Sequence, residues 1–171
     1  MFNAGSLAST ARSAILVCAM GIASVASAHA QTKPFGPGFD GWSFTATTEK
    51  PGLVVCRATR TAGNREDILG MRNDLKPYFS VKAEGRKGKW PGTIINVPGK
   101  PRGVLEWTST GEANGIRMWF PLPTSAVDRI VEAGAFEFSL PDTEDSGKVN
   151  LGKRAMDAWV RVHECVKANS R

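Results

Sequence analysis

The chain has 171 residues, 42% of them hydrophobic, and a formal net charge of +6. This length suits one domain with a core of its own and argues against several domains. The basic excess favours anionic partners, such as lipid headgroups, envelope polymers or nucleic acid, although the same charge also keeps a protein soluble.

The first 30 residues are predicted to form a signal peptide that is cleaved off. Arg12 precedes an apolar run, Ala14–Val25, and the segment Ala28–Ala30 places alanine at both specificity positions before Gln31. The apolar run is interrupted by glycine and serine and is too short to span a membrane comfortably. We therefore expect a protein of the periplasm or a secreted protein, with no transmembrane anchor after cleavage.

A lipoprotein signal is the alternative to this cleavage, because Cys18 closes the apolar run. The cysteine of a lipoprotein signal follows a small residue, whereas Cys18 follows Val17. We therefore favour cleavage after Ala30. The rest of the chain then has a formal charge of +5, since the leader carries one basic residue and no acidic one.

Residues 31–41 are rich in proline and glycine and are expected to form an extended arm before a single globular domain over residues 42–171. Within this domain, apolar and polar residues alternate over short runs, as in half-buried strands, and glycine, proline and polar residues separate the runs. The predicted strands are Trp42–Ala46, Leu53–Arg60, Ile68–Arg72, Pro77–Ala83, Thr93–Val97, Val104–Thr108, Ile116–Phe120 and Phe136–Leu140.

Two later segments have helical spacing. In Ser125–Gly134 the apolar residues share one face, Ser125 and Asp128 resemble a capping box, and Gly134 ends the helix. In Val149–Lys167 the apolar residues recur at three- and four-residue steps, and the charged residues fall mostly on the other face.

These elements predict a mainly β, α+β domain. The expected fold is an antiparallel β-sandwich or barrel-like domain of seven to eight short strands, with a short helix and a C-terminal helix. A parallel sheet is excluded, because the crossover helices that it needs are missing.

The two cysteines that follow the leader, Cys56 and Cys165, are predicted to form one disulfide, as is typical of exported proteins. Cys56 lies in a predicted strand, and Cys165 lies on or beside the apolar stripe of the C-terminal helix. The bond would tie the last helix to an early strand. A redox role is disfavoured, because the cysteines lack the C-x-x-C spacing.

A basic stretch is the candidate binding surface. Seven basic residues and one acidic residue lie between residues 76 and 102, with a tyrosine and a tryptophan among them. Cationic loops that carry an aromatic residue suit anionic polymers or headgroups, and a solvated charged hairpin is the alternative. A nearby strand also projects Arg117 and Trp119 from one face. The candidate ligand-binding residues are Lys82, Arg86, Lys87, Lys89, Trp90, Lys100, Arg102, Arg117 and Trp119.

Motifs for catalysis and for metal binding are incomplete. The chain has no Gly-x-Ser-x-Gly elbow, and the glycine-rich segment Gly85–Lys89 lacks the spacing of a phosphate loop. The segment Asp142–Gly147 matches the front of a calcium loop, but Lys153 replaces the final glutamate. His163, the only histidine after the leader, has no second histidine four residues on. We predict no metal, no cofactor and no nucleic-acid partner.

The C-terminal part resembles a known family. Ile130–Gly134 followed by Phe136–Phe138, and then Val149–Gly152 followed by Ala155, are similar to the ending of the invasion-associated locus B proteins. The resemblance covers roughly the last 45 residues, and the mid-domain cysteine pair of that family has no counterpart here. It implies a β-sandwich of the periplasm or outer envelope, and it carries over no catalytic residue.

We therefore expect a non-enzymatic binding protein of the cell envelope, acting on an anionic envelope component or on another envelope protein. A hydrolase or lyase is the alternative, which a deep pocket that gathers His163 with a carboxylate would favour. A protein inhibitor is a third, which a protruding rigid loop such as Lys87–Gly92 would favour.

Processing of the leader gives a direct prediction. The exported protein should begin at Gln31, because alanine occupies both specificity positions before that residue. The intact mass of exported material checks this. A lipid-modified Cys18 or a retained Met1 would contradict it.

Overall fold

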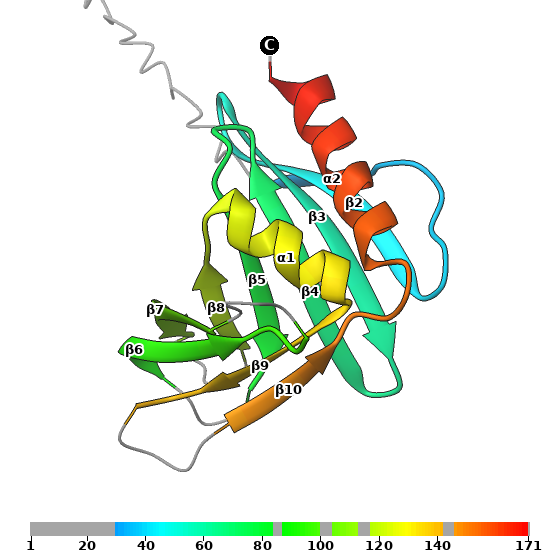
Figure 1. Cartoon of the computed structure of the whole chain (residues 1–171). Coiled ribbons are helices and arrows are strands. Elements are labelled where there is room, and N and C mark those ends of the chain that lie inside the picture. The colour runs from blue at the N-terminus through cyan, green and yellow to red at the C-terminus, as the bar shows by residue number, and fades with distance from the viewer. Residues whose placement is uncertain (1–29, 84–86, 100–103, 113–116, 142–145, 171) are drawn as a thin grey trace, which may run out of the picture.

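The computed structural model describes residues 30–83, 87–99, 104–112, 117–141 and 146–170. Ten strands form a single sheet in the order β1-β2-β3-β4-β5-β8-β7-β6-β9-β10, and every pair of neighbours is antiparallel. Two helices pack on one face of this sheet (Figure 1). The predictions of a mainly β antiparallel fold, a short helix and a C-terminal helix are confirmed.

The elements have the following bounds. The strands are β1 (Gln31–Pro34), β2 (Trp42–Lys50), β3 (Leu53–Ala62), β4 (Arg65–Arg72), β5 (Pro77–Lys82), β6 (Gly88–Asn96), β7 (Val104–Gly111), β8 (Arg117–Pro121), β9 (Ala135–Ser139) and β10 (Ser146–Asn150). The helices are α1 (Thr124–Ala133) and α2 (Ala155–Asn169).

The strand count was predicted too low, because β1 and β10 lack alternating hydrophobicity. All four residues of β1 are exposed, so this strand, which was predicted as part of an extended arm, is held by pairing with β2. In β10 only Val149 is buried. The two-sheet sandwich, one of the two predicted architectures, is also wrong, because all the strands belong to one sheet.

The sheet curves back on itself. In the strand order β10 lies six places from β4, yet the Nη1 of Arg65 in β4 donates to the carbonyl of Lys148 in β10 at 2.7 Å. Figure 1 shows β10 beside the lower ends of β3 and β4. The result is a partly closed, barrel-like sheet with a seam between β10 and the β3–β4 hairpin.

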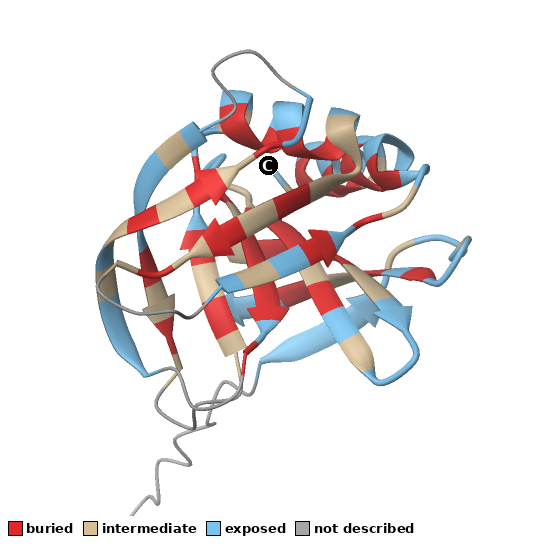
Figure 2. Cartoon of the chain, turned by 60° about the horizontal axis from the view of Figure 1, so that its bottom comes forward, coloured by how far each residue is buried: buried red, intermediate tan, exposed pale blue. Residues whose placement is uncertain are grey.

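The core fills the inside of this curve and the space beneath the helices. Buried and partly buried residues alternate along strands such as β8 and β9, and Figure 2 shows this alternation of classes on the sheet. Four buried phenylalanines meet at the centre: the ring centroids of Phe79 and Phe136 are 5.2 Å apart, and those of Phe120 and Phe138 are 5.1 Å apart. Such rings bury large apolar areas, which makes them the main source of core stability.

Helix α1 buries the predicted apolar face and ends at Gly134, whose φ of 68° is favourable for glycine. The predicted capping box is wrong, because Pro123 is the N-cap and no side chain caps the helix. Asp128 instead accepts a hydrogen bond from the indole Nε1 of Trp159 at 2.8 Å. This bond joins α1 to α2.

Helix α2 is covalently attached to the sheet. Cys56 in β3 and Cys165 in α2 form a disulfide across a sequence separation of 109, so the predicted pairing is confirmed. Both cysteines are buried among the core residues. The bond therefore fixes the C-terminal helix over the inner face of the sheet.

Removal of this disulfide should destabilise the protein strongly. In the chain-entropy description, a loop of this length contributes about 4–5 kcal/mol to stability. We expect both reduction and the Cys56→Ser substitution to lower the Tm substantially, as measured by thermal denaturation. Two free thiols in the oxidised, denatured protein would contradict the pairing.

Candidate functional site

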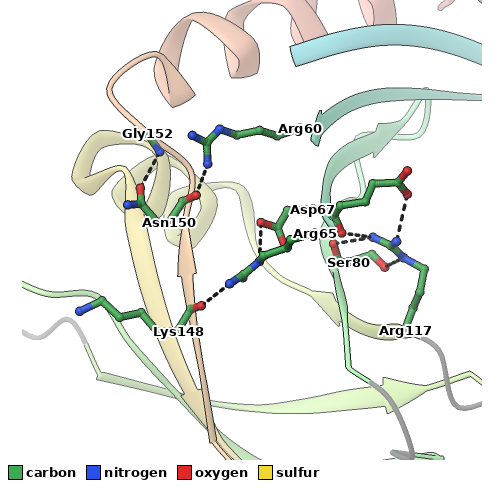
Figure 3. Close-up of polar contacts among 9 residues, drawn as sticks. Arg60, Arg65, Asp67, Ser80, Arg117, Lys148, Asn150 and Gly152 are labelled. Carbon is green, nitrogen blue, oxygen red and sulfur yellow. Dashed lines mark hydrogen bonds and ion pairs between the residues drawn. The ribbon is translucent and has the colours of Figure 1, made fainter. Parts of the chain in front are cut away.

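The free edge of β10 is bound by arginine side chains from the other side of the seam. The Nη1 of Arg60 donates to the carbonyl of Asn150, and the Nη1 of Arg65 donates to the carbonyl of Lys148 (Figure 3). In an antiparallel sheet every second residue of an edge strand points its backbone groups outward. The two arginines satisfy such outward carbonyls, so they complete the curve of the sheet without a further strand.

Arg65 is itself oriented by a buried carboxylate. Its Nε donates to both oxygens of Asp67, at 3.0 and 2.9 Å, and Asp67 is only 2% exposed. Burial raises the pKa of Asp67 above its ordinary value of 3.8, while the bond to Arg65 and the charges of Arg65, Arg117 and Arg60 act in the opposite direction. The carboxylate fixes the guanidinium so that Nη1 reaches β10.

A cleft of about 410 Å³ opens beside this contact, at the end of the seam. Three cationic side chains line it, Arg65 from β4, Lys82 from β5 and Lys148 from β10. Among the described residues that line the cleft, none is acidic. The remaining lining residues are Asn64, Val81, Ala83, Phe138, Ser146 and Gly147.

The floor of the cleft depends on a glycine. A Cβ on Gly147 would lie 2.4 Å from the ring of Phe138, closer than real Cβ atoms come. Phe138 in β9 is the register partner of Gly147 in β10. Because Gly147 has no side chain, the ring of Phe138 can lie flat against β10. The cleft thus combines a packed apolar floor with a polar, cationic rim, which is the usual composition of a ligand site.

The cleft includes one of the predicted ligand-binding residues, Lys82. Lys82 is the cross-strand partner of Arg117. Arg117, however, is engaged in the sheet: its Nε donates to the Ser80 hydroxyl at 2.8 Å, and Nη1 donates to Glu66 at 3.0 Å. Its Nη2 donates to two backbone carbonyls. Arg117 therefore joins β8 to β4 and β5.

Trp119 also has a bonding role on the outer face of the sheet. Its ring packs on Tyr78, with centroids 5.1 Å apart, and its Nε1 donates to Glu112 at 2.9 Å. The Tyr78 hydroxyl accepts from Arg57 at 3.0 Å, and burial raises the pKa of Tyr78. Trp119 is thus part of a bonded aromatic cluster and lies outside the cationic cleft.

The other described candidates are separated by the alternation of β6. Lys89 is in register with Thr110, which is in register with Trp119, so Lys89 belongs to the outer face. Trp90 is the next residue; it packs against the core and donates its Nε1 to the carbonyl of Lys87 at 3.0 Å. Lys89 and Trp90 therefore lie on opposite faces of β6.

Three of the predicted ligand-binding residues, Arg86, Lys100 and Arg102, lie outside the described residues, as does most of the calcium-like segment at 142–145. Sequence reasoning missed Arg65 and Lys148 as site residues. Both are single cations in polar turns or short strands, so no local pattern marks them. They share only their position across the seam from each other, which follows from the closure of the sheet.

Two features would favour the alternative functions, a pocket that gathers His163 for an enzyme and a protruding loop for an inhibitor, and neither is seen in the described part of the chain. His163 is exposed and packs edge-on against Trp159, with ring centroids 4.4 Å apart, and it lines none of the described clefts. Residues 88–92 belong to β6, so they do not form the protruding loop expected of an inhibitor.

No group of three His, Cys, Asp or Glu side chains among the described residues is placed to hold a metal ion. Within the same residues, neither helix has the length and apolar character needed to cross a membrane.

The position of Asp67 predicts a specific pH dependence. Because its pKa is higher in the folded protein than in the unfolded chain, the stability that its protonated form contributes is lost as the pH rises from 3.8 through the folded pKa. Asp67→Asn removes this titration. The Tm of the variant relative to wild type should therefore rise between about pH 4 and pH 7 in thermal denaturation.

The exposed carboxylate variant Glu106→Gln serves as the control for this series. Its Tm relative to wild type should change little over the same range. A relative Tm of Asp67→Asn that falls with rising pH would mean that the pairing with Arg65 outweighs burial.

Comparison of the chain with models of protein families, with curated proteins and with solved structures found no match.

Proposed function

We propose that this protein is a non-enzymatic binding protein of the cell envelope, which binds an anionic envelope component in the cationic cleft at the seam. The observation that carries the proposal is the convergence of Arg65, Lys82 and Lys148, from three different strands, on one cleft with no acidic residue among its described lining. Carboxylate and phosphate groups are the natural partners of such a site, because charge-assisted hydrogen bonds to arginine and lysine are stronger than neutral ones.

The donors of Arg65 support this proposal. Its Nε is bonded to Asp67 and its Nη1 to the Lys148 carbonyl, whereas Nη2 donates to no atom of the described chain. Because the guanidinium is fixed by two bonds, its remaining N–H groups keep one orientation. A bound anion would therefore meet a preorganised donor, which reduces the entropy cost of binding.

The compartment also favours an envelope role. A disulfide is typical of proteins in an oxidising compartment, and the leader sequence predicts export. We extend the resemblance to the invasion-associated locus B proteins in the same sense, as a proposal that the chain serves the periplasm or outer envelope.

The role of the cleft can be tested with one conservative substitution. Lys148→Gln should weaken binding to an anionic polymer, such as long-chain polyphosphate or polyglutamate, by about three- to fivefold at low ionic strength. The affinity should also fall steeply as salt is added, because ion pairs with a polyanion release counterions. Isothermal titration calorimetry on the purified protein measures both effects.

Lys33→Gln is the matched control, since it changes an exposed lysine on β1, the opposite edge of the same sheet. It should leave the affinity unchanged. The double variant Lys87→Gln/Lys89→Gln tests the alternative surface at the start of β6. A larger loss in the double variant than in Lys148→Gln would place binding on β6, and the absence of any polyanion binding would overturn the proposal.

A further inference from the structure

A second cationic cleft lies farther along the same seam. It measures about 210 Å³ and is lined by Arg60 from β3 and by Lys153 and Arg154, which precede α2. Asp40 is the one acidic residue among its described lining. Arg154 is already engaged, because its Nε donates to Asp157 at 2.7 Å and its guanidinium packs on Phe39. The donors open to a ligand therefore belong to Arg60 and Lys153.

Arg60 has unused hydrogen-bonding capacity in this cleft. Its Nη1 donates to the Asn150 carbonyl, and within the described chain its Nε and Nη2 donate to no other atom. The guanidinium lies over Gly152, where a Cβ would come within 3.0 Å of Nη2 (Figure 3). Gly152 also has a φ of 76°, which glycine adopts without strain. The backbone therefore leaves room for the arginine at this position.

The second cation, Lys153, is also available. It is exposed and makes no hydrogen bond or ion pair with the part of the chain that the structure describes.

Lys148 in the first cleft contacts Glu137 at 3.2 Å, but the Lys148 side chain is 68% exposed, so this ion pair is weak and easily exchanged for a ligand.

The two clefts follow one continuous stretch of chain. Lys148 lines the first cleft, Gly152 and Lys153 line the second, and the residues between them run along the seam. β10 separates Lys148 from Asn150 by about 7 Å. The chain from there to Lys153 adds at most about another 10 Å. The two lysines are thus up to about 17 Å apart along the chain, a span that a chain of anionic groups can follow.

We infer that the ligand is an extended polyanion that occupies both clefts along the seam. This inference rests on the proposed function and specifies its ligand as a polymer of repeated phosphate or carboxylate groups. Binding at two linked sites raises the effective concentration of the second group, so a long chain gains affinity that separate short anions lack.

Chain length and Lys153→Gln together test the inference. Long-chain polyphosphate should bind at least about tenfold more tightly than tripolyphosphate, which covers less of the seam. Lys153→Gln should weaken binding of the long chain about threefold and lower its salt slope by about one, because one ion pair is lost. The same substitution should leave the affinity for tripolyphosphate unchanged. Lys167→Gln, which changes an exposed lysine near the other end of α2, is the matched control.

The outcomes separate the two proposals. If Lys148→Gln weakens binding but the two chain lengths bind alike and Lys153→Gln has no effect, the first cleft acts alone and the inference fails while the proposed function stands. Loss of all polyanion binding would overturn both. Polyglutamate of matched length distinguishes carboxylate from phosphate chemistry. Binding to vesicles of anionic lipid without binding to either polymer would show a membrane surface as the partner and overturn the inference.

Discussion

The outward carbonyls of β10 are the constraint on which the rest of the site depends. They require hydrogen-bond donors for two reasons. A buried backbone carbonyl without a donor costs free energy, and an exposed one can pair with the strand of another chain. Arg60 and Arg65 supply the donors from the β3–β4 hairpin. A side chain with five N–H groups satisfies a carbonyl and still has donors left. The closure of the sheet and the cationic character of the seam therefore have one cause.

The same arrangement explains the buried carboxylate. Asp67 lies close to three arginines, and its bidentate bond to Arg65 sets the direction in which that side chain extends. Without the carboxylate, Arg65 would be a flexible surface cation. With it, the guanidinium spans the seam and becomes one wall of a cleft. A buried ionic group of this kind contributes orientation more than stability, because desolvation offsets much of its attraction.

The sequence was informative where burial is periodic and uninformative where backbone pairing dominates. The alternation of apolar and polar residues predicted the central strands, and helical spacing predicted α1 and α2. The pairing of Cys56 with Cys165 was predicted because they are the two cysteines that follow the leader. β1 and β10 bury almost nothing, so they have no such pattern. The basic stretch drew attention to Lys82, but Arg117 proved to be bonded within the sheet, and Arg65 and Lys148 were missed. These site residues are 83 positions apart in sequence, and only the curvature of the sheet brings them together.

The disulfide to α2 also has a consequence for the order of events during folding. Helix α2, which packs on β2, β3 and β4, is the last of the described elements, and the strand bonded to it, β3, is among the first. The apolar faces of β2, β3 and β4, on which α2 packs, therefore stay uncovered until residues 155–169 have been synthesised, and contacts so distant in sequence form slowly. During that interval the apolar face is open to other chains. The native disulfide thus forms late, because Cys56 has no partner for it until residue 165 has joined the chain.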